Sequence, residues 1–428
     1  MRRSELWSIL LAVVLTSCSL PVTNSVVRSS TPLNRDAQSD GSSIKVRTLY
    51  SFGYHANDGV KPESAFSAIE SCTSTCREDL YGTTAAGGSN NAGTIYDVYT
   101  GDVSLGYFDE NVVMNFSPAS TGSDPMSSVL VGERHGRPKF LFATASQGGP
   151  HGKGTIVTAA GDMLAFDGRN GAVPTSGLTA LNPKGFNSYT TTLKGGAHGL
   201  GTILAISFFN NRFTSRVLYS FGASGAAHPN SALDLVWGSA YYGTTSGSKN
   251  VPATVYEFMP AQSTRPVTTL YSFQSSTDGS EPTGVNGEYT KSGPAALFGT
   301  TVKGGVSGYG TLYELNPSGS TYTLVKLHDF GGGSTDGAYP QGAPAYYYYT
   351  LHFNVLLGVT SGGGAHNCGT IFSYDLPSSQ YAVIYSFTCK KDGGHPLAGL
   401  AAGADGFVGT TSAGGMYHDG TVFTFKPL

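Results

Sequence analysis

Charged residues are scarce in this chain of 428 residues: they make up only 12% of it, and the formal net charge is −3. No stripe of lysine or arginine runs along the sequence, which excludes the basic footprint of a nucleic-acid-binding protein. No segment carries a convincing run of apolar residues at helical spacing. With 11% aromatic residues and so little charge, the chain is also unlike a disordered one. These absences indicate an ordered domain built from strands.

The common catalytic signatures are missing as well. No Lys-Ser/Thr pair follows the glycine-rich loops, so they are turns and not phosphate-binding loops. No GxSxG nucleophile elbow is present. Carboxylate pairs for glycoside chemistry come from residues that are distant in sequence, so a carbohydrate-active enzyme stays open. We expect no cofactor.

Glycine, in contrast, is abundant, at 59 residues, and it is placed periodically. The clearest example is LFGTTVKGGVSGYGTLYEL, from Leu297 to Leu315. It predicts a strand over 297–301, a turn at Gly304-Gly305 where positive φ is easy, and a strand over 311–315 whose side chains alternate. Gly299 has no side chain, so a ring or another backbone can approach it closely.

Relatives of this stretch recur seven times. The threonine that opens the last strand of each copy falls at 94, 155, 202, 254, 311, 370 and 421. Repeats of this length with four short strands are typical of propeller blades. The predicted strand order is a short segment after a DG…P turn, then LYGTT, then GTxF, then LYSF. We therefore predict an all-β fold, a single seven-bladed β-propeller with four-stranded blades.

The first repeat begins with an LYSF strand, and the last repeat ends just after GTVFTF, so the last blade lacks its outer strand. The strand at 44–52 can supply it and so remove two exposed sheet edges. We predict that this strand pairs with residues 421–425 and closes the ring.

The repeats resemble the GloVer tandem-repeat family of bacterial surface proteins with varied anchors. Units five and seven carry the resemblance best, with LYSF (270–273), TDGSEP (277–282), FGTTVKGG (298–305), IYSF (384–387) and VGTTSAGG (408–415). The second and third copies lack LYSF and have other residues in place of GTT. The resemblance covers nearly all of 44–428 and implies a propeller-like surface protein, with no established activity and no catalytic residues.

The N-terminus reads as an export signal. Arg2 and Arg3 precede an apolar run, 6–15, that is too short to span a bilayer well. Leu15-Thr16-Ser17-Cys18 resembles the bacterial lipobox, which implies cleavage before Cys18 and lipidation of that cysteine; the alternative is a plain secretory signal. We expect a signal peptide at 1–17, the lipidated Cys18 and a flexible tether rich in Ser, Thr and Pro at 18–43, and the propeller at 44–428.

By analogy with bacterial sorting, Ser19 favours the outer membrane, so the expected location is an outer-membrane lipoprotein or the cell surface, with secretion as the alternative. Membrane contact would be through the lipid anchor only. Four cysteines then remain in an oxidising compartment. We predict the disulfides Cys72–Cys76 and Cys368–Cys389. The alternative is a metal site, but no histidine lies beside them at zinc-motif spacing.

In a propeller, the DG…P turns and the GGxxxxGT loops open on the same face. This face would collect two sets of polar side chains: Asp58, Asp278, Asp336 and Asp392 from the turns, and His151, His198 and His366 from the loops. They could bind a sugar, a metal or an anionic group. The alternative is structural, because Asp-Gly is a turn pair and the histidines share a repeat register. We expect no metal. The tyrosine run 346–349 is either a stacking platform or an inner strand with alternate rings packed between blades, and we favour the strand.

The function predicted from the sequence is that of a lipid-anchored monomer acting as a binding module, for carbohydrate or an envelope protein, through this face. The alternatives are an extracytoplasmic polysaccharide lyase or hydrolase, and a purely structural surface protein.

Overall fold

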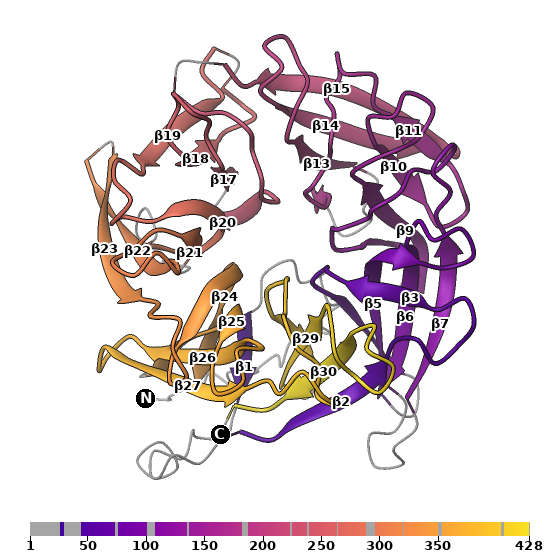
Figure 1. Ribbon diagram of the computed structural model, residues 1–428. Helices are drawn as coiled ribbons and strands as arrows, with labels where there is room; N and C mark the ends of the chain where they lie inside the picture. The colour runs from indigo at the N-terminus through magenta and orange to yellow at the C-terminus, as the bar shows by residue number, and fades with distance from the viewer. Residues whose placement is uncertain are drawn as a thin grey trace, which may run out of the picture.

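The computed structural model describes residues 26–29, 44–72, 76–100, 108–134, 137–181, 187–222, 225–237, 239–262, 264–287, 296–319, 321–349, 353–403 and 406–427. Over these residues the chain forms seven sheets arranged as blades around a ring (Figure 1). This confirms the predicted seven-bladed propeller. Within the same residues, no helix is long and apolar enough to cross a membrane.

Each blade has four strands that follow one another from the inside of the ring outwards, and one additional strand joins each of the sheets of blades 1 and 6. Blade 1 contains β3 (Gly59–Pro62), β5 (Cys76–Gly87), β6 (Thr94–Thr100) and β7 (Phe108–Asn115), with β4 (Ser67–Cys72) also paired to β5. Blade 2 contains β8 (Leu130–Arg134), β9 (Arg137–Ala145), β10 (Thr155–Thr158) and β11 (Met163–Ala165). Blade 3 contains β12 (Thr179–Ala180), β13 (Asn187–Thr192), β14 (Thr202–Phe209) and β15 (Arg212–Ser220).

Blade 4 contains β16 (Asp234–Trp237), β17 (Ala240–Thr245), β18 (Thr254–Phe258) and β19 (Val267–Ser272). Blade 5 contains β20 (Ser280–Gly287), β21 (Leu297–Lys303), β22 (Thr311–Ser318) and β23 (Thr321–Asp329). Blade 6 contains β24 (Gly337–Tyr349), β25 (Phe353–Gly363), β26 (Thr370–Asp375) and β27 (Gln380–Ser386). Blade 7 contains β28 (Ala401–Gly403), β29 (Gly406–Thr411), β30 (Thr421–Phe425) and β2 (Val46–Ser51).

The repeat register read from the sequence is the register of the blades. All seven marker threonines are the first residues of third strands, in β6, β10, β14, β18, β22, β26 and β30. In blade 5 the predicted hairpin pairs Leu297 with Leu315 and Thr301 with Thr311. The two threonine hydroxyls of that last pair lie 2.9 Å apart and buried. Five other blades have the same buried threonine pair, with Ala145 replacing the first threonine in blade 2.

The glycine of the GTT segment makes room for a ring, as expected. A Cβ atom at Gly299 would lie 2.3 Å from the hydroxyl oxygen of Tyr313. The Tyr313 side chain is fully buried on the neighbouring strand of the same sheet. The same contact recurs between Gly409 and the ring of Phe423 in blade 7. The GTT glycine therefore lets an aromatic ring lie flat against the sheet.

The N-terminal strand β2 closes the ring. It pairs antiparallel with β30, with Val46 opposite Phe425 and Ser51 opposite Thr421, which confirms the predicted closure. Figure 1 shows β2 alongside β30, so the first and last segments of the propeller share one sheet. A further strand, β1 (Val26–Ser29), runs parallel to β24 within the segment predicted to be a tether.

The hydrophobic core lies between the blades. The tyrosine run illustrates this, because it belongs to β24, the first propeller strand of blade 6. Tyr346 packs into a cluster with Phe298 of blade 5, whereas Tyr347 packs with Phe407 of blade 7, and both tyrosines are buried. The prediction of an inner strand with rings packed alternately on both sides is confirmed for these two side chains. The side chains of residues 348 and 349 lie outside the described part.

Candidate functional site

The DG…P turns and the loops between second and third strands lie at one end of the propeller, as predicted. In blade 1 the amide of Gly88 donates to the carbonyl of Asp58 at 2.8 Å. In blade 6 the amide of Gly364 donates to the carbonyl of Asp336 at 2.7 Å. Backbone bonds therefore hold each loop on its turn, and we call this face the loop-bearing end.

The four predicted aspartates support the turns themselves. The carboxylate of Asp58 is buried and accepts hydrogen bonds from the Tyr50 hydroxyl at 2.7 Å and from the amides of Gly53 and Gly59, each at 2.8 Å. The other three aspartates are bonded in the same way, to Tyr271 and Ser275 at Asp278, to His328 and Tyr381 at Asp336, and to Tyr385 and Thr388 at Asp392. Their oxygens are occupied by the protein, which favours the structural reading.

The titration of Asp278 reflects its hydrogen bonds. Burial tends to raise the pKa of Asp278, but hydrogen bonds from Ser275, Gln274 and Tyr271 hold that pKa below its ordinary value. Burial and the nearby Asp278 raise the pKa of Tyr271 to about 12. The aspartate stays ionised and the tyrosine stays protonated at neutral pH, as a stable donor–acceptor pair requires.

The three predicted histidines are exposed at loop tips on different blades. His151 lies between β9 and β10, His198 between β13 and β14, and His366 between β25 and β26. The ring of His198 packs against Gly222, the residue after its LYSF segment. Among the described residues, only one group of three or more metal-ligand side chains has its ligand atoms within 4.8 Å of one another, and none of these histidines belongs to it.

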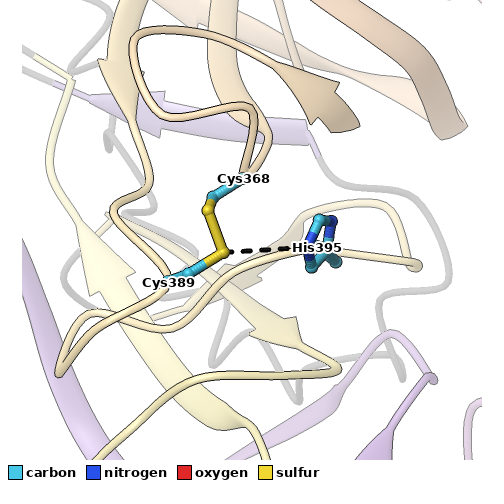
Figure 2. Close-up of side chains that lie close together, drawn as sticks. All are labelled: Cys368, Cys389 and His395. Carbon is cyan, nitrogen blue, oxygen red and sulfur yellow. Dashed lines mark hydrogen bonds between the residues drawn. A yellow bond between two sulfur atoms is a disulfide. The ribbon is translucent and has the colours of Figure 1, made fainter.

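That group is Cys368, Cys389 and His395. Cys368 and Cys389 form the predicted disulfide, with Cα atoms 5.6 Å apart, and link a loop of blade 6 to the turn that leaves the same blade. The Nε2 atom of His395 lies 3.7 Å from the sulfur of Cys389 (Figure 2). The structure thus confirms one disulfide. The side chains of Cys72 and Cys76, and the whole of Cys18, lie outside the described residues, so their assignments stay predictions.

Sequence reasoning missed a ring of seven residues, each directly before the proline of a DG…P segment or its equivalent. All seven have φ between 54° and 62°, although none is glycine: Lys61, Asp124, Val173, His228, Glu281, Tyr339 and His395. Such a conformation costs about 1–2 kcal/mol for an L-residue. In the sequence, each of these residues could be recognised only by the proline that follows it. A residue before proline ordinarily has an extended backbone, so the sequence did not indicate positive φ.

The strained conformation allows a bond between successive blades. The amide of His395 donates to the carbonyl of Cys368 at 2.8 Å, and the amide of His228 donates to the carbonyl of Leu200 at 2.8 Å. Four more junctions have the equivalent bond, from Lys61, Asp124, Val173 and Tyr339. The following proline also packs on the glycine that follows the acceptor, as Pro396 does on Gly369. This junction bond fixes loop and turn at the loop-bearing end.

Inside the ring lies a cavity of about 210 Å³, lined by segments of all seven blades. Small residues occupy it where the inner segments converge, among them Ala65, Ser128, Ala232, Gly284 and Ala343. The side-chain amide of Asn286, another lining residue, donates a hydrogen bond to the carbonyl oxygen of Pro344 at 3.2 Å. The inner segments of all seven blades therefore define the inside of the ring.

Aromatic side chains are exposed at the loop-bearing end. Tyr54, in the first turn, is 64% exposed, and Tyr417, in the loop of blade 7, is 39% exposed. Their ring centroids lie 5.9 Å apart, and His55 packs edge-on against Tyr54 at 4.6 Å. Met416, next to Tyr417, is 58% exposed. These four side chains form what we call the tyrosine platform.

Solved structures resemble this chain at low similarity. The endo-arabinase of Bacteroides thetaiotaomicron is 12% identical, with 59% of this chain and 93% of the arabinase covered and a TM-score of 0.36. A trans-sialidase-active mutant of the Trypanosoma rangeli sialidase is 10% identical, with 90% of this chain and 60% of that chain covered and a TM-score of 0.41. A protein of unknown function from Dyadobacter fermentans is 10% identical, with 89% and 99% covered and a TM-score of 0.44.

No curated protein matches the chain. A family model does match, over residues 157–346 and 246–428, and it describes the Gloeobacter/Verrucomicrobia repeat. The matches together cover more than half of the chain and include the fifth and seventh copies, which carry the LYSF, DG…P and GTT pattern. The chain therefore belongs to the Gloeobacter/Verrucomicrobia repeat family.

Proposed function

We propose that this protein is a binding module of the cell envelope that recognises carbohydrate at the loop-bearing end of its propeller. The observation that carries the proposal is the tyrosine platform. Two exposed tyrosine rings from opposite ends of the chain, Tyr54 and Tyr417, meet there beside an imidazole. The ring closure by β2 brings them together.

The chemistry of the platform suits a sugar. The faces of tyrosine rings offer flat apolar area at low cost in conformational entropy, and the hydroxyl groups remain available for hydrogen bonds. The imidazole of His55 packs edge-on against the ring of Tyr54 and extends this flat aromatic surface. A saccharide presents the complementary surface, an apolar face of C–H groups rimmed by hydroxyls. A small apolar area with a few polar groups is a typical ligand site.

Separate observations support a location outside the cytoplasm. The repeat family and the disulfide are consistent with a protein outside the cytoplasm. We propose in addition that Cys18 is lipidated and anchors the propeller to the outer membrane. Expression of the full gene with Cys18→Ala tests this, because the parent should partition with membranes and label with a fatty acid, whereas the variant should do neither. Equal labelling of both proteins would contradict the anchor.

The binding proposal is tested by titrating the purified protein with envelope and plant oligosaccharides and following its melting. A ligand at 100 times its dissociation constant adds about 2.7 kcal/mol to the stability of the folded state. We expect Tyr54→Ala and Tyr417→Ala to abolish this shift. The matched control is Phe209→Ala, because Phe209 is 76% exposed but ends β14 at the opposite end of the propeller.

Other outcomes would select the alternatives. Oligosaccharide products in the same incubations would favour the lyase or hydrolase. A shift that survives both tyrosine variants but is lost in the triple variant of His151, His198 and His366 to Ala would move the site to the histidine loops. No shift with any saccharide would overturn the proposal and favour a protein partner or a structural role.

A further inference from the structure

We propose that reduction of the Cys368–Cys389 disulfide creates a binding site for one soft divalent metal ion such as Zn²⁺, with Cys368 Sγ, Cys389 Sγ and His395 Nε2 as its ligands. The three ligand atoms already lie within 4.8 Å of one another. Two thiolates and an imidazole are a preferred zinc ligand set, and a fourth position would be left for water.

The distance between His395 and the sulfur is the first argument. With ordinary zinc–sulfur and zinc–nitrogen bond lengths, a tetrahedral site separates sulfur from nitrogen by about 3.6 Å. Nε2 of His395 lies 3.7 Å from Sγ of Cys389. Once the disulfide bond is broken, the sulfurs of Cys368 and Cys389 need to separate to about 3.8 Å to bind one zinc ion. Their Cα atoms lie 5.6 Å apart, so this asks only for side-chain rotation.

The orientation of the imidazole is the second argument. Nδ1 of His395 lies 2.7 Å from the carbonyl oxygen of Ser361, and an imidazole nitrogen facing a carbonyl is the protonated one. Nε2 therefore carries the lone pair and faces the sulfur, as Figure 2 shows. Metal-binding histidines are held in the same way, by a hydrogen bond from the other ring nitrogen.

The third argument is that the backbone junction that positions His395 does not depend on the disulfide. The amide of His395 bonds the carbonyl of Cys368, and this is the junction bond that five other blade junctions make without cysteines. His228 occupies the same register, and its Nδ1 bonds the carbonyl of Leu193 at 2.9 Å. The repeat thus orients a histidine at both places, but only His395 has thiols beside it.

Space and access also suit the site. A Cβ atom at residue 394 would lie 2.7 Å from the sulfur of Cys389. Because Gly394 has no side chain, this clash is avoided. Cys368 is buried, whereas Cys389 and His395 are half-buried. A reductant and a metal ion can therefore reach the outer side of the group.

The chemistry balances in two steps. A trialkylphosphine reductant with one water molecule converts the disulfide to two thiols and is itself oxidised to the phosphine oxide. The metal ion then displaces the two thiol protons, while the imidazole binds as the neutral form through Nε2 and keeps its proton on Nδ1. In the cell, a dithiol carrier would be the reductant, and its two thiols would become a disulfide.

The test uses the full chain in a C18S/C72S/C76S background, so that Cys368 and Cys389 are the two cysteines left of five. The phosphine-reduced protein is titrated with Co²⁺ as a spectroscopic probe, and Zn²⁺ is added as competitor. We expect one Co²⁺ per chain, with a sulfur-to-cobalt charge-transfer band and the intense visible bands of tetrahedral cobalt. The oxidised protein should show neither band.

Two variants locate the site. We expect His395→Ala to weaken Co²⁺ binding at least about tenfold, whereas the matched His228→Ala should leave it unchanged. Equal binding by the His395 variant, the absence of tetrahedral thiolate bands, or the same spectrum in the oxidised protein would overturn the proposal. Loss of the native β-sheet circular dichroism on reduction would also overturn it, because the site needs the folded junction.

Discussion

The hydroxyl group of Tyr50 donates a 2.7 Å hydrogen bond to Oδ2 of Asp58, and both side chains are buried. The tyrosine lies near the end of an outer strand, and the aspartate opens the turn into the next blade. The pair recurs as Tyr271 with Asp278 and as Tyr385 with Asp392. It therefore links successive blades by joining the LYSF segment to the DG…P segment.

Replacing Tyr50 with phenylalanine should cost about 2 kcal/mol of stability, because it removes a buried hydrogen bond to a charged acceptor. Chemical denaturation of parent and variant measures the difference. The matched control is Tyr219→Phe, since Tyr219 has the same LYSF position but the turn after it contains no aspartate. The control should change stability by less than about 0.5 kcal/mol. Equal losses in both variants would refute the role of the pair.

Tyr313 should behave in the opposite way. Its hydroxyl is buried and has no hydrogen-bond partner among the described residues. Blades 6 and 7 carry Phe372 and Phe423 in the same register, also fully buried. Tyr313→Phe removes a buried polar group without a partner, so we expect unchanged or higher stability. Denaturation curves decide this, and a loss of more than about 1 kcal/mol would show that the hydroxyl does contribute.

Stability should fall in acid through Asp336. Burial favours the protonated carboxyl, but hydrogen bonds from His328, Tyr381 and the amide of Gly331 outweigh it and hold the pKa of Asp336 below its ordinary value. The folded state therefore binds this proton more weakly than the unfolded chain. The stabilisation is present above about pH 4 and is lost as the pH falls through the lower folded pKa.

The measurement is the free energy of unfolding of the parent and Asp336→Asn between about pH 6 and pH 2.5. The difference between the two proteins should shrink as the pH falls below about 4. Tyr381→Phe, which removes a 2.7 Å hydrogen bond to the carboxylate, should move this decline to higher pH. Parallel curves over the whole range would show that Asp336 makes no pH-dependent contribution.

Ring closure predicts a sharp difference between two truncations. Removal of residues 1–52 deletes β2 and leaves β30 as an open edge, so the propeller should lose its cooperative melting transition. Removal of residues 1–43 keeps β2 and deletes only the short strand β1, so it should leave that transition nearly unchanged. Calorimetry of both proteins checks this. If the shorter protein melts like the longer one, β2 does not hold the ring together.

The sequence alone was enough for the architecture. The marker threonines, the glycine pairs and the period-two alternation predicted the strands, the blade number and the closure by residues 44–52. These features are local, since a strand or turn depends on residues a few positions apart, and sevenfold repetition reinforces a weak signal. The Cys368–Cys389 disulfide was predictable for the same reason, because one hairpin carries both cysteines.

What the tertiary structure decided is which side chains meet. In the sequence, Asp58 and His151 were both candidates for a binding face. Packing directs the carboxylate into its own turn and leaves the imidazole exposed. The tyrosine platform joins Tyr54 to Tyr417 only because the ring closes. His395 meets the disulfide because the junction bond turns the residue before each proline to positive φ. Such contacts depend on how sheets pack against one another, and no local pattern encodes that.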